Sequence, residues 1–168
     1  ADLMTIREYK GSFSGLKMCF IGDGNNMANS LMVGALKMGM KFSIACPEGY
    51  HPDAELTKWA EEFGDKFEIT SDVKKAAKDA DVLYTDVWAS MGQEEEQKKR
   101  EEAFKGFCVD SELMSLAAPG VKFLHCLPAH RGEEVTDEVM ESEASIVWDE
   151  AENRLHAQKA ILEWVFSD

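Results

Sequence analysis

Short apolar segments rich in β-branched and aromatic residues recur along this chain of 168 residues, and helical patterns separate them. Segments that are apolar throughout are typical of strands buried on both faces. Strands that alternate with helices form an open, mostly parallel α/β sheet with helices on both faces. We therefore predict a doubly wound, Rossmann-like α/β sheet of about five strands. Candidate strands lie at 16–22, 41–47, 66–70, 81–88, 121–127 and 145–150.

Helical patterns fill most of the remaining chain, and no linker or internal repeat interrupts them, so we expect residues 1–168 to form a single domain. In one of these helices, three acid-before-base pairs four residues apart support an exposed surface that needs no partner: Glu94–Lys98, Glu95–Lys99 and Glu96–Arg100. The predicted helices span 1–10, 29–38, 53–64, 71–80, 93–104 and 152–166.

The net charge is −14, from 32 acidic and 18 basic residues. This charge argues against nucleic acid as a partner, because lysine and arginine must neutralise phosphates. It also argues against an anionic membrane surface, and no apolar run approaches the roughly 20 residues that cross a membrane. The four cysteines have no CxxC spacing, so we expect reduced thiols in a cytoplasmic protein.

In an open α/β sheet, ligands bind beyond the carboxyl ends of the strands, so the residues that follow each strand are the informative ones. The segment "GDGNNMA" (22–28) allows three interpretations. Gly22 and Gly24 match part of a dinucleotide fingerprint, but Met27 replaces the third glycine and no acidic residue ends the second strand. The glycines also fit a tight turn, and the two asparagines could hold a carboxylate at a helix N-terminus.

Asp86 follows an apolar strand, where an unpaired carboxylate would be costly to bury. We expect it to need a cationic partner, from either the protein or a ligand ammonium group. The alternative is a plain strand end, with Ser90 capping the helix that follows. The two interpretations are compatible.

His125 and Cys126 are adjacent at the end of a predicted strand. Adjacent strand residues point to opposite faces, which argues against a shared metal site and against a Cys–His nucleophile pair. Two interpretations remain open. The thiol and its neighbouring carbonyls line a ligand cleft, or the pair is a buried cysteine beside a hydrogen-bonded histidine.

The segments "GDGNNMANS", "DVWASMGQEEE", "FLHCLPAHRGEEVTDEV" and "DEAENRLHAQKAIL" occur in this order along the chain. Together they closely resemble the L-ornithine-binding half of the ornithine carbamoyltransferases, and the "SMG" and "HCLP" segments distinguish this branch from aspartate carbamoyltransferases. The resemblance covers essentially the whole chain. It implies a transferase of arginine biosynthesis that converts carbamoyl phosphate and L-ornithine into L-citrulline and phosphate, without metal or organic cofactor.

The resemblance also implies how L-ornithine is bound. Asn26 and the backbone of Met91 would hold the α-carboxylate. Asp86 and Ser90 would hold the α-ammonium group, which would be the cation that Asp86 needs.

The reacting groups follow from the same resemblance. Cys126 and the carbonyls of Cys126 and Leu127 would face the δ-amine and the carbamoyl group, and Arg154 would reach the oxygens of carbamoyl phosphate. A free δ-amine has a lysine-like pKa of roughly 10.4 and must lose its proton before it attacks. We expect the cleft, with Cys126 and Asp86 beside the amine, to favour the neutral form.

The family's other domain carries the phosphate motifs "STRTR" and "HPxQ", and neither occurs in this sequence. The resemblance thus implies a second domain without its carbamoyl-phosphate-binding partner. Such a domain would be catalytically incompetent alone, because only Arg154 would remain to bind the phosphate. The parent enzyme would be a homotrimer, and this chain a monomer or self-associated through its terminal helices. The alternative function is a stand-alone small-molecule-binding or engineered scaffold domain without carbamoyl transfer.

Overall fold

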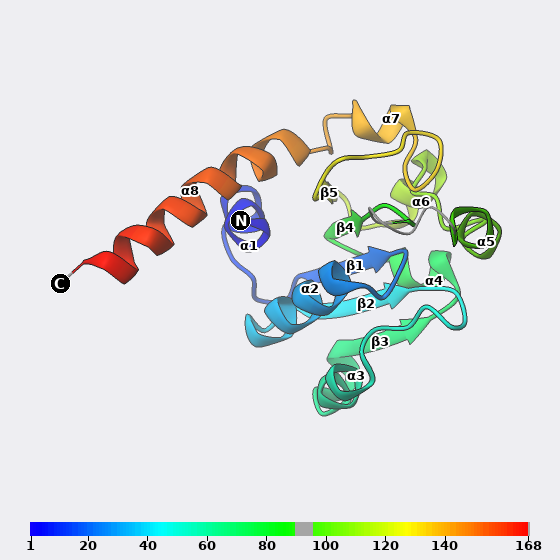
Figure 1. Cartoon of the computed structure of the whole chain (residues 1–168), viewed down its shortest axis with the longest axis horizontal. Helices are drawn as coiled ribbons and strands as arrows, with labels where there is room; N and C mark the ends of the chain where they lie inside the picture. Colours follow the sequence, from blue (N-terminus) through cyan, green and yellow to red (C-terminus); the bar gives the residue numbers. More distant parts are fainter. Residues whose placement is uncertain (90–95, 168) are drawn as a thin grey trace.

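Five parallel strands form a single sheet with the order β3-β2-β1-β4-β5 (Figure 1). The structure is a computed structural model that describes residues 1–89 and 96–167. The strands are β1 (Lys17–Ile21), β2 (Lys41–Ala45), β3 (Phe67–Thr70), β4 (Val82–Thr85) and β5 (Lys122–His125). Strand order reverses between β1 and β4, so the predicted doubly wound α/β sheet is confirmed.

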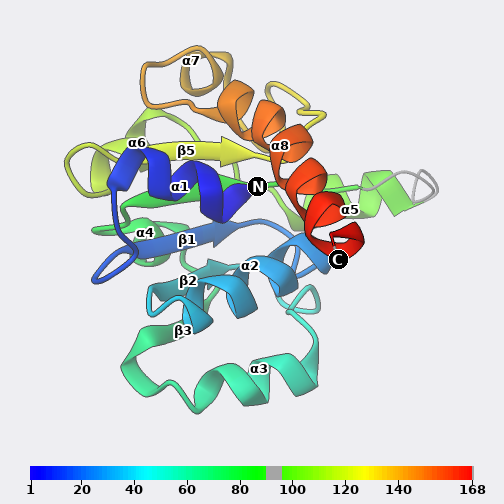
Figure 2. The same cartoon turned by 90° about the vertical axis from the view of Figure 1, so that its left-hand side faces the viewer.

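Helices cover both faces of the sheet, as the apolar character of the strands requires (Figures 1 and 2). Helices α1 to α3 lie over one face, and α4, α6 and α7 lie over the other; α8 begins between the two cores, with its N-cap Ile146 in the first and Val147 in the second. The helices are α1 (Asp2–Lys10), α2 (Asn26–Lys37), α3 (Ala54–Glu61), α4 (Val73–Ala77), α5 (Gln97–Ala103), α6 (Ser111–Leu116), α7 (Asp137–Met140) and α8 (Val147–Phe166), with a short 3-10 turn at Gly64–Lys66.

The central strand β1 shows why these segments are apolar at every position. Met18 and Phe20 pack into the core between the sheet and helices α1 to α3, whereas Cys19 and Ile21 pack into the core on the opposite face. All four side chains are buried. Successive strand residues point to opposite faces, and here both faces are covered.

The predicted strand at 145–150 is wrong. Ser145 forms only an isolated bridge with Phe123, and the chain then turns into α8 at Val147. Val147 is fully buried in the core on the face that α4, α6 and α7 cover. The apolar pair Ile146–Val147 therefore belongs to the buried start of a helix. Periodicity alone cannot separate a short buried strand from such a helix start.

The helix predicted at 93–104 is an exposed surface only in part. Its described portion begins at Gln97, and Arg100 is buried there, with its guanidinium bonded to the Asp23 carboxylate and the Trp88 carbonyl. Of the three predicted ion pairs, Glu96–Arg100 is present at 3.6 Å. Glu94 and Glu95 lie outside the described residues. The predicted exposed surface is therefore wrong for Arg100, which ties α5 to the loop after β1 within the chain.

Helix α8 is the longest element in the described part of the chain, and its C-terminal half extends beyond the sheet (Figure 1). Trp164 and Phe166 are each 80% exposed there. None of the described helices, α8 included, combines the length and apolar character that a membrane crossing requires. The first turns of α8 pack against α1 and β5, next to the carboxyl ends of the strands.

Candidate functional site

Three chain segments converge at the carboxyl ends of the neighbouring strands β1, β4 and β5. They are the loop of residues 22–25, the residue Asp86 that follows β4, and the turn of residues 125–127 that follows β5. Hydrogen bonds join side chains from all three segments. This is the sheet edge, beside the reversal in strand order, at which the sequence predicts a ligand site.

Asn25 connects the first of these segments to the second. It is the N-cap of α2, and its Oδ1 accepts hydrogen bonds from the backbone nitrogens of Met27 (2.9 Å) and Ala28 (3.2 Å). Its Nδ2 donates to Oδ2 of Asp86 at 2.9 Å. The predicted residue, Asn26, is instead the first residue of α2 and its side chain is exposed. The N-cap role of Asn25 was not predicted, although an asparagine just before a helix is a recognised N-cap signal.

Asp86 is 8% exposed, and neutral groups satisfy its carboxylate. Besides Asn25, it accepts hydrogen bonds from its neighbour's backbone nitrogen, Val87 N, at 2.8 Å and from the thiol of Cys126 at 3.1 Å. The predicted protein cation is not among these hydrogen bonds. Three neutral donors meet much of the cost of burying the carboxylate, so any cation would have to be a ligand.

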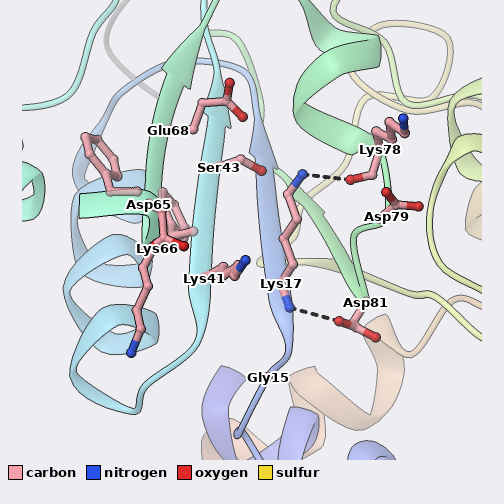
Figure 3. Close-up of a pocket in the computed structure, with 12 residues that line it drawn as sticks. Gly15, Lys17, Lys41, Ser43, Asp65, Lys66, Glu68, Lys78, Asp79 and Asp81 are labelled. Atoms are coloured by element: carbon pink, nitrogen blue, oxygen red, sulfur yellow. Dashed lines mark hydrogen bonds between the residues drawn. The ribbon is translucent and has the colours of Figure 1, made fainter. Parts of the chain in front are cut away.

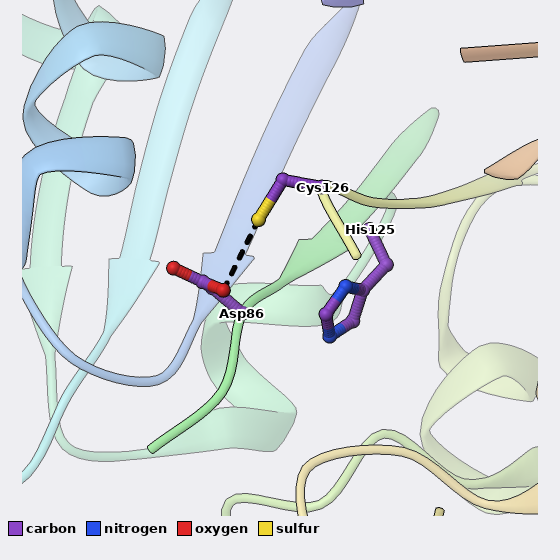
Figure 4. A group of neighbouring side chains, drawn as sticks. All are labelled: Asp86, His125 and Cys126. Carbon is purple, nitrogen blue, oxygen red and sulfur yellow. Dashed lines mark hydrogen bonds between the residues drawn. The ribbon is translucent and has the colours of Figure 1, made fainter. Parts of the chain in front are cut away.

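The Cys126 thiol is a hydrogen-bond donor in this arrangement (Figure 4). Burial is the largest cause that raises its pKa, and the charge of Asp86 and the hydrogen bond to it raise the pKa further. The thiol therefore stays protonated near neutral pH and does not act as a thiolate nucleophile. It contributes a polar, uncharged wall beside the Asp86 carboxylate.

The geometric argument that separated His125 from Cys126 does not hold. Strand β5 ends at His125, so face alternation no longer governs Cys126, and ligand atoms of Asp86, His125 and Cys126 all lie within 4.8 Å of one another. Both imidazole nitrogens already have partners, however. Nε2 lies 3.1 Å from Oε1 of Glu134, and Nδ1 accepts from the backbone nitrogen of Leu127 at 2.9 Å. The hydrogen-bonded histidine of the alternative interpretation is thus present, and a metal ion would have to break one of these contacts.

The glycines of the first loop serve the tight turn. Gly22 has φ of 138°, in a region that side chains rarely adopt. A Cβ on Gly24 would lie only 2.2 Å from the backbone nitrogen of Pro52. Gly24 N also donates to the carbonyl of Tyr50 at 2.8 Å. Close packing against residues 50–52 therefore accounts for Gly24 without a bound phosphate.

Two adjoining cavities of about 680 and 410 Å³ open beside Cys126. Cys126, Leu127 and Arg154 line both, and the guanidinium of Arg154 is the only one among the described residues that line them. The structure thus brings these three predicted residues together. Ser90 and Met91 lie outside the described residues.

Asp2 and Glu150 line the smaller cavity as well. Burial, followed by a hydrogen bond to Asp2, raises the pKa of Glu150 to about 8, although the Tyr84 hydroxyl donates to its Oε1 at 2.6 Å and opposes this rise. Glu150 is thus largely protonated near neutral pH. Sequence reasoning missed the Asp2–Glu150 pair, because its members are far apart along the chain.

A further cavity, of about 380 Å³, lies at the opposite edge of the sheet, where the strands begin (Figure 3). Its four lysines and four acidic residues balance one another, and the Lys17 ammonium group donates to the carbonyl of Lys78 at 2.7 Å. None of the predicted site residues lies there. The cavities at the carboxyl edge are therefore the better candidates for a functional site.

The fold and this edge define an α/β domain with a candidate site for a small polar ligand beside the reversal in strand order. The family model "Aspartate/ornithine carbamoyltransferase, Asp/Orn binding domain" matches residues 14–165. The chain belongs to this family.

Curated and solved relatives agree with this assignment. An ornithine carbamoyltransferase of Nitratidesulfovibrio vulgaris is 59% identical over 168 residues, covering 100% of this chain and 56% of the relative. One from Pyrococcus abyssi is 57% identical over 166 residues, covering 96% of this chain and 52% of the relative. The solved structure of ornithine carbamoyltransferase from Pyrococcus furiosus superposes with a TM-score of 0.90 at 55% identity, covering 96% of this chain and 53% of that chain. The chain thus spans about half the length of the relatives it matches.

Proposed function

We propose that this chain provides the L-ornithine-binding half of an ornithine carbamoyltransferase, which transfers the carbamoyl group of carbamoyl phosphate to L-ornithine. The observation that carries the proposal is the Asp86 carboxylate, held by the neutral donors Asn25 and Cys126, next to cavities that Arg154 lines. A buried carboxylate whose hydrogen-bond donors among the described residues are all neutral suits a ligand ammonium group. The names of the relatives at 57–59% identity support the choice of substrates.

The amino-acid end of L-ornithine would bind between β4 and α2. Asp86, with Ser90, would hold the α-ammonium group. Asn26, with the backbone of Met91, would hold the α-carboxylate at the start of α2, whose first turn contains no acidic residue. The positive end of a helix dipole favours an anion there. Asn25 would hold β4 and α2 in place relative to each other, because it accepts a hydrogen bond from Met27 in α2 and donates one to Asp86 after β4.

The δ-amine would reach the turn after β5. The carbonyls of Cys126 and Leu127 would accept its hydrogens and direct the nitrogen lone pair at the carbamoyl carbon, while the protonated thiol of Cys126 faces the same space. A bond forms between nitrogen and carbon, the tetrahedral intermediate expels phosphate, and the proton that the nitrogen loses passes to the departing phosphate. Arg154 would hold the phosphate oxygens, so that proximity and charge stabilisation lower the barrier.

We further propose that residues 1–168 act as one domain that does not catalyse the reaction alone. Arg154 is the only guanidinium among the described residues lining the two cavities, and one guanidinium is little to hold a doubly charged phosphate. Affinity for carbamoyl phosphate would be weak or absent, and the parent enzyme would be a homotrimer. The chain would be monomeric or self-associated through α1 and the exposed end of α8.

Titration calorimetry with L-ornithine tests the binding claim. We expect weak, millimolar-range binding, and a loss of at least about tenfold in the Asp86→Asn variant, because the ammonium group loses its charged partner. Asp72→Asn is the matched control, since Asp72 caps α4 on the other face and asparagine also caps helices. Absence of heat at millimolar L-ornithine would refute the binding claim, and equal affinities of wild type and Asp86→Asn would place the ammonium group elsewhere.

A second measurement tests the transfer claim. Incubation of the chain with carbamoyl phosphate and L-ornithine should give no L-citrulline above the background rate. Turnover by the chain alone would show that the phosphate needs no further residues.

A further inference from the structure

Glu134 is a fully buried carboxylate behind the turn that follows β5. Its Oε1 lies 3.1 Å from Nε2 of His125 and accepts a hydrogen bond of 2.6 Å from the backbone nitrogen of His130. Its Oε2 has no hydrogen-bond partner among the described residues. Burial of a carboxylate costs free energy, and the two hydrogen bonds that Oε1 accepts offset part of this cost.

These bonds define the state of His125, whose side chain is itself buried. Because Nδ1 accepts a hydrogen bond from the backbone nitrogen of Leu127, Nδ1 carries no proton. The neutral ring then carries its proton on Nε2 and donates it to Glu134. The carboxylate and the backbone amide, on opposite sides of the ring, thereby select one tautomer.

The hydrogen bond from Leu127 to the ring matters for the backbone. Leu127 has φ of 53°, a left-handed conformation that is unfavourable for a non-glycine residue. The bond to Nδ1 of His125 is a local interaction that offsets this cost. Glu134 also binds the backbone nitrogen of His130, so one carboxylate anchors both ends of the segment 125–130.

We propose that Glu134 is a positioning residue, which fixes the Nε2–H tautomer of His125 and through it aims the carbonyls of Cys126 and Leu127 at the δ-amine of L-ornithine. This role rests on the proposed function. Glu134 lines neither cavity beside Cys126, so it acts on the ligand only through His125 and the turn.

The test compares Glu134→Gln, which keeps an acceptor for both bonds, with Glu134→Leu, which removes it. The neighbouring Glu133→Gln is the matched control, because the side chain of Glu133 is 39% exposed and lies 3.6 Å from Nδ1 of His130, whereas Glu134 is the one that contacts the His125 ring. Nitrogen-15 NMR of the histidine rings reports the tautomer without any ligand. We expect the Nε2–H tautomer of His125 in wild type, Glu134→Gln and Glu133→Gln, and a mixture of tautomers, with a shifted Leu127 amide signal, in Glu134→Leu.

Calorimetry with L-ornithine then measures the consequence. We expect Glu134→Leu to bind about tenfold more weakly than wild type, whereas Glu134→Gln and Glu133→Gln stay within about threefold. An Nδ1–H or doubly protonated ring in wild type would overturn the proposal, as would an unchanged tautomer or affinity in Glu134→Leu. Should Glu134→Leu fail to fold, the wild-type and Glu134→Gln tautomers decide the matter. If wild type does not bind L-ornithine, the proposed function fails, and the ring tautomer still decides whether Glu134 controls His125.

Discussion

Replacement of Gly24 by alanine should destabilise the fold and weaken the site together. The new Cβ would lie 2.2 Å from Pro52 N, 2.3 Å from His51 C and 2.7 Å from His51 O, all of them backbone atoms. Non-bonded heavy atoms prefer about 3.5–4.0 Å, so the two chain segments would have to separate by more than about 1 Å. The shift would stretch the bond from Gly24 N to Tyr50 O and move the adjacent N-cap, Asn25.

Overpacking of this kind costs about 1–3 kcal/mol, and the upper end is expected because backbone cannot rotate out of the way. For a chain of this length, about 3 kcal/mol lowers Tm by roughly 6–12 °C. Urea and thermal unfolding followed by circular dichroism measure the change. Gly34→Ala is the control, because its Cβ would meet the flexible Leu3 side chain at 3.3 Å and alanine favours the interior of α2 by about 1 kcal/mol.

We expect Gly34→Ala to be at least as stable as wild type. The reasoning is refuted if Gly24→Ala unfolds at the wild-type urea concentration. Wild-type affinity for L-ornithine in a destabilised Gly24→Ala would show that the loop does not position Asn25.

Two further predictions concern the residues around Asp86. Asn25→Ala should cost about 1 kcal/mol through loss of the α2 cap, and should also weaken L-ornithine binding, because Asp86 loses a donor. Asp53→Ala removes the α3 cap at a similar cost and should leave affinity unchanged; equal affinities in both variants would contradict the link to Asp86. Folding raises the pKa of Glu150 from 4.5 to about 8, so the folded chain binds more protons than the unfolded chain in that interval, and this residue's contribution to stability falls as pH rises from about 5 to 8. Glu150→Gln should flatten this decline in urea midpoints, and an unchanged slope would be evidence against the raised pKa.

The sequence predicted the sheet well because its signal is local. A strand such as Lys17–Ile21, buried on both faces, is apolar at almost every position, and the helices between the strands show their own period. The prediction of a strand at 145–150 was wrong because it rested on local pattern alone: two buried apolar residues, Ile146 and Val147, fit the start of a helix as well as a strand. The start of α2 was placed three residues late, at 29 instead of 26, and this error hid the role of Asn25 as N-cap.

The candidate site was predictable in part. Asp86, Cys126, Leu127 and Arg154 were predicted as site residues because they follow strands or belong to motifs, and the structure brings them to one edge of the sheet. The contacts behind them were not predictable, because the fold creates them between residues distant in sequence. Glu150 accepts from the His125 backbone nitrogen across 25 residues, and no local pattern marks such a pair.

The strand order β3-β2-β1-β4-β5 divides the chain into two contiguous halves that meet between β1 and β4. Asn25 belongs to the first half, whereas Asp86 and Cys126 belong to the second. A ligand held by residues of both halves would oppose their separation, because it would bind the joined sheet and not the parted halves. The free energy that separates the two halves of the sheet would then rise with the fraction of chains that hold the ligand.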